Sequence, residues 1–106
     1  MSVVSKTIKY LLDKNISVST AESCTGGLLA AEFTAVSGIS KIYKTGLITY
    51  SNDSKIKNLK VKSSTIKRYG AVSRQVCAQM CLHLHKISKS QLTFSTTGVA
   101  LSLIHI

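Results

Sequence analysis

The fold is decided by residues 16–27, ISVSTAESCTGG. Its first part, in which Ile16, Val18 and Thr20 alternate with serines, has the pattern of a short strand. The segment AESCTGG then brings polar side chains and two adjacent glycines, and the apolar residues after it recur at helical spacing. A strand, a tight turn and a helix start in this order are typical of α/β proteins, which place their chemistry at the carboxyl ends of strands.

The remaining sequence alternates between helical and strand patterns. Apolar spacing, polar breaks and serine caps predict helices at about residues 4–12, 29–36, 54–59, 63–69 and 73–87, the last with an apolar stripe through Val76, Cys77, Met80, Cys81, Leu84 and Ile87. Strands are predicted at about residues 16–20, 45–51 and 92–97. Because no repeat or linker interrupts this alternation, we expect one α/β layered domain over residues 1–106.

Length and hydropathy narrow the class of protein. The chain has 106 residues, of which 44% are hydrophobic, and this is enough for one domain with a modest core. No apolar run approaches the roughly 18 to 20 residues that a membrane span needs, and the N-terminus lacks a signal-peptide pattern. We therefore expect a soluble cytoplasmic protein without a membrane partner.

The charge balance is strongly basic. Fourteen Lys and Arg face four Asp and Glu, for a net charge of +10, and only Arg68 and Arg74 carry a guanidinium. Specific nucleic-acid recognition usually adds arginine forks or aromatic stacking platforms, which this lysine-rich chain lacks. The charge suits an anionic small substrate, and a specific nucleic-acid partner is disfavoured.

The cysteines do not predict a disulfide framework or a metal centre. There are three, an odd number, and no secretion signal accompanies them. Cys77, Cys81 and His85 recur every four residues, which permits a metal site on one helical face. Apolar residues share that face, and cysteine is common in cores, so a packing role is favoured and no metal is expected.

Three polar clusters fall at the predicted strand ends: residues 22–27, residues 50–55 and residues 96–98. A serine nucleophile needs a base, and the histidines lie in a helix and at the C-terminus. A lysine whose pKa is lowered by burial can serve instead. The residues alone leave alternatives open, since the first cluster also suits a helix cap and Cys24 competes with Ser23 as the nucleophile.

Taken together, these clusters resemble a known family. The segments AESCTGG at residues 21–27, GLITYSN at 46–52 with Lys55, and YGAVS at 69–73 occur in the order and at the spacing of the CinA C-terminal domain family, the nicotinamide-nucleotide amidases. The resemblance covers roughly Ser5 to Gly98. It implies a three-layer α/β/α sandwich that hydrolyses the carboxamide of nicotinamide mononucleotide to nicotinate mononucleotide and ammonia.

The resemblance also implies roles for particular residues. Ser23 corresponds to the nucleophile, Lys55 to its base and Tyr50 to an orienting or relay group. Ser40 matches a family serine near the site and is a second candidate hydroxyl. Contacts to substrate are expected from Glu22, Thr25, Gly26, Gly27, Ser40, Asn52, Thr97 and Gly98. The family needs no metal or other cofactor, and its bacterial members are often homodimers.

The match departs from the family pattern after Gly98. A Thr-Gly-x-Ala-Gly-Pro-like turn, further strands and a C-terminal helix are expected there, whereas the chain reads VALSLIHI at residues 99–106. We expect an incomplete domain with a tail of non-family sequence, which would expose a sheet edge. Two further hypotheses are therefore kept: a non-catalytic basic module that binds nucleotides or nucleic acid, and an inactive fragment that only associates with another subunit.

Overall fold

The computed structural model describes residues 2–98 of the chain. Helices and strands alternate along it in the order α1 (Val3–Asp13), β1 (Val18–Glu22), α2 (Leu28–Thr34), η1 (Ile39–Lys41), β2 (Tyr43–Ile48), α3 (Asn52–Leu59), α4 (Ser63–Tyr69), α5 (Arg74–Ser88) and β3 (Leu92–Ser95). The residues 99–106, predicted to be a non-family tail, lie outside the described part.

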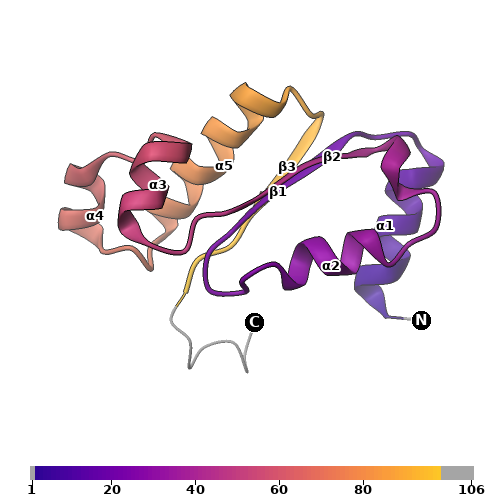
Figure 1. Cartoon of the computed structure of the whole chain (residues 1–106), viewed down its shortest axis with the longest axis horizontal. Coiled ribbons are helices and arrows are strands. Elements are labelled where there is room, and N and C mark those ends of the chain that lie inside the picture. The colour runs from indigo at the N-terminus through magenta and orange to yellow at the C-terminus, as the bar shows by residue number, and fades with distance from the viewer. Residues whose placement is uncertain (1, 99–106) are drawn as a thin grey trace.

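The described strands form a parallel sheet in the order β2-β1-β3. Helices α1 and α2 cover one face, and α3, α4 and α5 lie on the other side (Figure 1). A parallel sheet buried on both faces by crossover helices is the layered α/β architecture. The predicted three-layer α/β/α sandwich is confirmed.

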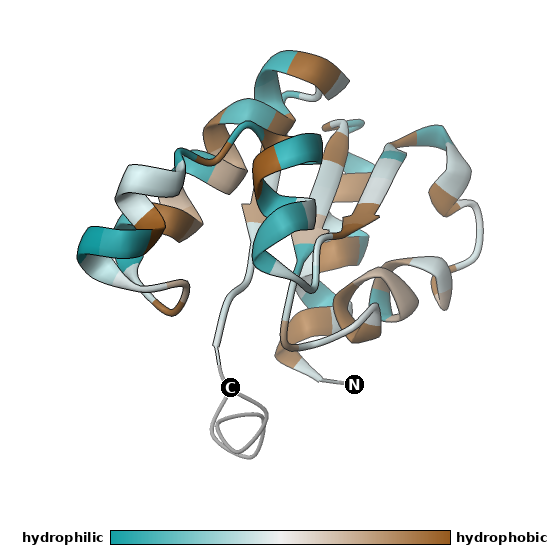
Figure 2. Ribbon diagram, turned by 60° about the vertical axis from the view of Figure 1, so that its left-hand side comes forward, coloured by the Kyte–Doolittle hydropathy of each residue, from teal (hydrophilic) through white to brown (hydrophobic). Residues whose placement is uncertain are grey.

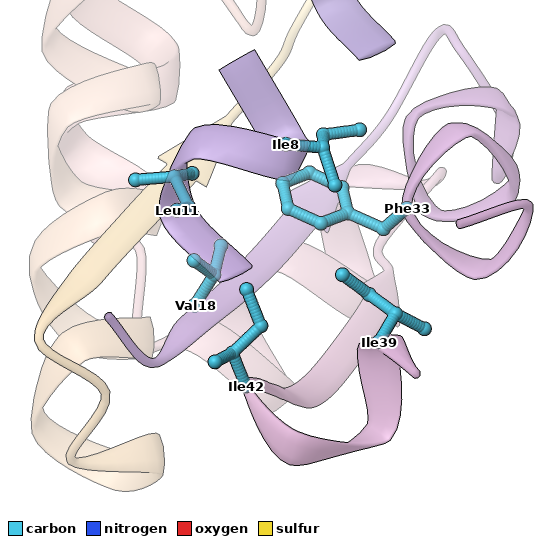
Figure 3. Close-up of a cluster of buried hydrophobic side chains, with 6 residues drawn as sticks. All are labelled: Ile8, Leu11, Val18, Phe33, Ile39 and Ile42. Atoms are coloured by element: carbon cyan, nitrogen blue, oxygen red, sulfur yellow. The ribbon is translucent and has the colours of Figure 1, made fainter. Parts of the chain in front are cut away.

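One core lies between the sheet and helices α1 and α2. Val18 of β1 points into it and meets apolar side chains from both helices and from the segment before β2 (Figure 3). Its buried members are Ile8, Leu11, Val18, Phe33, Ile39 and Ile42. The ring of Phe33 also stacks on that of Tyr43, with ring centres 5.0 Å apart.

A second core lies on the opposite face of the sheet. Ala21 of β1 points into it, because side chains along a strand alternate between the two faces. Its buried members are Ala21, Leu59, Val61, Val76, Met80 and Leu84. The helices on this side alternate between hydrophobic and hydrophilic residues along their length (Figure 2). Strand β1 is thus buried on both faces, and the sheet is held at its centre.

Several predicted element bounds were wrong. Strand β2 spans Tyr43–Ile48 and not 45–51, so Thr49 and Tyr50 belong to the loop that follows it. Helix α3 begins at Asn52 because Ser51, and not Ser54, is its N-cap: the Ser51 hydroxyl accepts from the Ser54 amide. Lys55 lies in the first turn of this helix.

The predicted apolar stripe of α5 is only partly buried. Val76, Met80 and Leu84 are buried, but Ile87 is exposed. The Cys77 and Cys81 thiols are half-buried and contact hydroxyls of β3, with the Cys77 sulfur 3.1 Å from the Ser95 Oγ and the Cys81 sulfur 3.1 Å from the Thr93 Oγ1. Within residues 2–98, no His, Cys, Asp and Glu side chains gather as a metal-binding group of three or more. In the same range, no helix has the length and hydrophobicity needed to cross a membrane.

Candidate active site

The polar segments that follow β1, β2 and β3 meet at the carboxyl end of the sheet. The Ser23 amide donates to the Thr96 carbonyl at 3.1 Å, and the Thr49 amide donates to the Glu22 carbonyl at 2.8 Å. These bonds continue the pairing of the three parallel strands beyond their last residues. The clusters predicted from the sequence therefore converge, with Ser23 in the middle.

Ser23 and Lys55 are in direct contact at this end. The Lys55 Nζ lies 2.9 Å from the Ser23 Oγ, and both side chains are buried, with 2% and 5% of their surface exposed. β1 ends just before Ser23, whereas Lys55 comes from the start of α3, which packs on the α5 side of the sheet. The fold thus brings together the two groups that the sequence predicted as nucleophile and base.

The environment of Lys55 favours the neutral amine. Its Nζ donates to the Ser23 Oγ and to the Tyr50 carbonyl at 3.0 Å, and both of these acceptors are neutral. Burial lowers the pKa of Lys55 below its ordinary value of 10.5, and an electrostatic interaction with Cys24 partly opposes that shift. A lysine whose pKa is lowered in this way becomes more available as a proton acceptor.

Tyr50 reaches the site through its main chain. Its carbonyl oxygen accepts from Lys55 Nζ at 3.0 Å, and the Ser23 hydroxyl lies 3.4 Å from the same oxygen. The Tyr50 side chain is 64% exposed. Tyr50 lies beside Ser23 and Lys55, and within the described chain its peptide carbonyl, and not its phenol, contacts the amine. The orienting or relay role of the phenol stays a prediction.

The Glu22 carboxylate caps the N-terminus of helix α2. One carboxylate oxygen accepts from the Leu29 amide at 2.8 Å and from the Thr25 hydroxyl at 2.6 Å, and the other accepts from the Ala30 amide at 2.9 Å. These amides belong to the first turn of α2, whose N-terminus favours a negative charge. Glu22 was predicted to contact substrate, and the structure instead gives its buried carboxylate to the cap of α2.

The threonines of the segments after β1 and β3 bind each other and a neighbouring loop. The Thr25 Oγ1 lies 2.9 Å from the Thr96 Oγ1, and the Thr97 hydroxyl donates to the Ala71 carbonyl at 2.8 Å. Thr97 thereby links the end of β3 to the loop before α5. Asn52 is exposed at the first position of α3, and Gly98 is half-buried beyond β3.

The two glycines after Ser23 make the turn possible. Gly26 and Gly27 have φ values of +59° and +108°, and the left-handed region is costly for residues with a Cβ. A Cβ on Gly27 would also lie 3.2 Å from the Ile48 Cδ1. The Gly26 amide donates to the Ser23 carbonyl at 3.0 Å and is therefore already engaged. The glycines shape the backbone next to Ser23, and Gly26 does not supply a free amide.

Ser40 does not join this site in the single chain. It is exposed within η1, which precedes β2, whereas Ser23 and Lys55 lie where β1 and β2 end. In Figure 1 the chain enters β2 near α1 and leaves it toward α3, at the opposite end of the sheet. Within one chain, Ser40 lies at the other end of the sheet from Ser23 and Lys55, because parallel strands separate the residues before them from the residues after them. Its predicted contact with substrate stays a prediction.

Cys24 stays an alternative nucleophile. Its thiol is buried, unpaired with another cysteine, and close enough to influence the pKa of Lys55. Ser23 has the advantage of a direct 2.9 Å contact with the amine. The geometry therefore ranks Ser23 first.

Sequence reasoning missed Thr49. Its side chain is 1% exposed, and its hydroxyl makes no hydrogen bond within residues 2–98. The signal that could have found it is strand alternation, since Thr49 lies two residues after Leu47, which faces the α5 side like Ala21. An unpartnered buried hydroxyl next to a reactive pair marks a position of chemical interest.

An apolar hollow of about 200 Å³ lies elsewhere, on the face of the sheet covered by α1 and α2. It is lined by Val3, Val4, Thr7, Ile8, Leu11, Leu29, Phe33 and Phe94. It contains no titratable side chain. This hollow therefore offers no acid or base group.

Comparison with known proteins agrees with the fold and the motifs. The sequence model of the CinA C-terminal domain matches residues 1–102. The chain belongs to the CinA C-terminal domain family. A CinA relative from Clostridium novyi, named competence-damage inducible protein, is 51% identical over 92 residues, which are 87% of this chain and 22% of the relative. One from Acetivibrio thermocellus with the same name is 46% identical over 92 residues, with the same shares covered.

Solved CinA superfamily structures share this fold. A protein from Agrobacterium tumefaciens, described as competence/damage inducible, has a TM-score of 0.86 and 34% identity over 93% of this chain and 65% of its own. A CinA superfamily protein from Escherichia coli has a TM-score of 0.84 and 33% identity over 90% of this chain and 55% of its own. The chain thus spans about a fifth of the curated relatives and between 55% and 65% of these solved chains.

Proposed function

We propose that this CinA domain is an amidohydrolase that deamidates nicotinamide mononucleotide to nicotinate mononucleotide and ammonia. The observation that carries the proposal is the buried contact of 2.9 Å between the Lys55 Nζ and the Ser23 Oγ. Among residues 2–98, no carboxylate is a partner of this amine. A hydroxyl held against an amine of lowered pKa is the arrangement of an activated nucleophile. Family membership and the net charge of +10, which attracts a phosphate-bearing substrate, support it.

The proposed reaction begins with acylation. Neutral Lys55 takes the hydroxyl proton of Ser23 while the Ser23 Oγ attacks the carboxamide carbon. Because the Gly26 amide is bonded to the Ser23 carbonyl, we assign oxyanion stabilisation to the other backbone amides of residues 24–27. Collapse of the tetrahedral intermediate breaks the C–N bond, and the Lys55 ammonium gives its proton to the departing nitrogen, which leaves as ammonia.

Deacylation completes the cycle. Water attacks the acyl carbon and gives one proton to Lys55, which passes it to the Ser23 Oγ as the ester bond breaks. Nicotinate mononucleotide is released, and Ser23 and Lys55 return to their starting states. The Tyr50 carbonyl keeps the amine in place throughout, through the hydrogen bond of 3.0 Å.

Ammonia release from nicotinamide mononucleotide tests this function. We expect turnover by the 106-residue chain and its loss in Ser23→Ala and in Lys55→Met, which keeps an unbranched side chain but cannot accept a proton. A longer CinA relative serves as the positive control. Activity that persists in Lys55→Met would overturn the lysine base, and activity in the relative alone would favour an inactive fragment.

The net charge of +10 favours a second candidate, a non-catalytic module that binds nucleotides or nucleic acid. Affinity for a polyanion falls steeply as salt rises, because bound counterions are released on binding. If the chain is an amidohydrolase, we expect it to bind an oligonucleotide only weakly at 150 mM salt. Tight, salt-resistant binding together with absent amidase activity would favour the module.

A further inference from the structure

The hydroxyl of Thr49 is unusual for a buried polar group. It is 1% exposed, yet its Oγ1 has no hydrogen-bond partner within residues 2–98. Buried hydroxyls are almost always bonded, since leaving one unpaired is costly. By contrast Thr20, on β1, is equally buried, and its hydroxyl lies 2.6 Å from the Tyr43 hydroxyl. Thr49 is therefore an exception that packing alone does not explain.

The backbone of Thr49 joins the two halves of the candidate site. Its amide donates to the carbonyl of Glu22, the residue before Ser23, at 2.8 Å. Its own successor, Tyr50, supplies the carbonyl that holds Lys55. By strand alternation Thr49 and Ser23 point to the same face of the sheet, the face against which α3 packs Lys55.

We infer that the Thr49 hydroxyl positions the water that hydrolyses the acyl-enzyme, an inference that rests on the proposed amidohydrolase function. In the free protein the Ser23 Oγ and the Tyr50 carbonyl already occupy the amine of Lys55. Once Ser23 is acylated, its ester oxygen is a poor partner for the amine, and a water has to bind between Lys55 and the acyl carbon. Thr49 offers the free buried acceptor that such a water needs.

The proposed hydrolysis moves one proton from the water to Lys55 and then from Lys55 to Ser23. The water donates one hydrogen to the neutral Lys55 amine and the other to the Thr49 Oγ1, which leaves a lone pair directed at the acyl carbon. The new C–O bond forms as Lys55 takes the first proton. The tetrahedral intermediate then breaks its bond to the Ser23 Oγ, which receives that proton from Lys55. Thr49 neither gains nor loses a proton and is a positioning residue.

Hydrolysis of p-nitrophenyl acetate by the 106-residue chain separates the two half-reactions. Acylation releases a burst of p-nitrophenol, and deacylation sets the steady rate that follows. In Thr49→Val we expect the burst to be retained and the steady rate to fall about tenfold, the effect of losing one hydrogen bond in the rate-limiting step. Thr49→Ser, which keeps the hydroxyl, should restore the rate to within about twofold of the parent.

Thermal unfolding distinguishes a Thr49 hydroxyl that positions water from one that stabilises the fold. Thr49→Val replaces an unpaired hydroxyl by a methyl group of similar shape, so its Tm should be unchanged or higher. The matched control is Thr20→Val, which breaks a hydrogen bond that is made: its Tm should fall by about 4 °C or more, with the steady rate unchanged. A lower Tm in Thr49→Val would overturn the inference, because the hydroxyl would then have a structural partner.

The remaining outcomes separate this inference from the proposed function. An unchanged steady rate in Thr49→Val, or equal loss of burst and steady rate, overturns the role of Thr49 and leaves the function standing. A parent chain with no burst and no acetyl group on Ser23 by mass spectrometry overturns the nucleophile, and the role of Thr49 with it. An acetyl group on Cys24 has the same consequence.

Discussion

The Ser23 hydroxyl and the Lys55 amine are separated by 32 positions in the sequence and by 2.9 Å in the structure. Ser23 directly follows β1, the central strand of the sheet, and Lys55 follows β2, which is the neighbouring strand. Parallel pairing brings the residues that follow both strands to one edge. This juxtaposition makes Lys55 the most informative residue to change.

The first prediction concerns the pH dependence of stability. Burial lowers the pKa of Lys55 in the folded state below its ordinary value of 10.5, which it keeps in the unfolded chain. At a pH between the folded and the unfolded pKa, the unfolded chain therefore binds more protons than the folded chain. Below the folded pKa, the buried charge therefore carries its full penalty, and the penalty disappears as pH rises toward 10.5. We expect Lys55→Met to be more stable than the parent near neutral pH, by an amount that shrinks at alkaline pH.

Urea unfolding of both chains from pH 7 to 10 measures this difference. The two chains are compared because Tyr43 also makes stability depend on pH. Burial raises the pKa of the Tyr43 phenol above 10.0, so the stability that the neutral phenol contributes is lost as the pH rises through that raised pKa. Tyr43 is present in both chains and cancels. A constant difference between them would show that Lys55 is not perturbed by folding.

A second prediction separates the main chain of Tyr50 from its side chain. Tyr50→Phe removes an exposed hydroxyl and keeps the carbonyl that accepts from Lys55. We expect the Tm to change by less than about 2 °C and the pKa of Lys55, followed by NMR of its Cε, to be unchanged. If the pKa of Lys55 moves, the phenol orients the amine after all. Lost amidase activity with an unchanged pKa would mean that the phenol acts on substrate.

A third prediction concerns Glu22 as the cap of α2. Glu22→Gln puts an amide NH₂ against backbone N–H donors and removes a charge-assisted bond, so we expect a loss of about 2 kcal/mol in the free energy of unfolding. Urea denaturation measures it, and Glu32→Gln, an exposed change on the same helix, should cost less than about 0.5 kcal/mol. Equal effects of the two changes would contradict the capping role.

A fourth prediction follows from the packing of Gly46. A Cβ at this position would overlap the Tyr43 hydroxyl, which is bonded to Thr20 across the two strands. We expect Gly46→Ala to cost about 1–3 kcal/mol, as overpacking usually does. In the Tyr43→Phe background the overlapping oxygen is gone, and the same change should cost less. Additive losses in this double-mutant cycle would show that the two positions are not coupled.

The sequence by itself was enough to predict the class of fold and several of the residues that meet at the carboxyl end of the sheet. Helical periodicity depends on which face of the helix is buried, and residues 76–84 show that pattern clearly. The alternation at residues 16–20 indicated a strand, although β1 is buried on both faces. The paired glycines after Ser23 could be interpreted because few other residues adopt the backbone of that turn. Ser23, Tyr50 and Lys55 were proposed as partners only because three motifs matched a family together.

The tertiary structure decided how each of these residues is used. Whether Tyr50 acts through its phenol or its carbonyl, and whether Glu22 faces substrate or helix α2, depends on side-chain direction, which residue type does not specify. Ser40 and Thr49 show the same limit: strand direction puts the first at the far end of the sheet, and pleating buries the second beside Ser23. Local sequence patterns report local burial, but contacts between distant segments exist only once the sheet has formed.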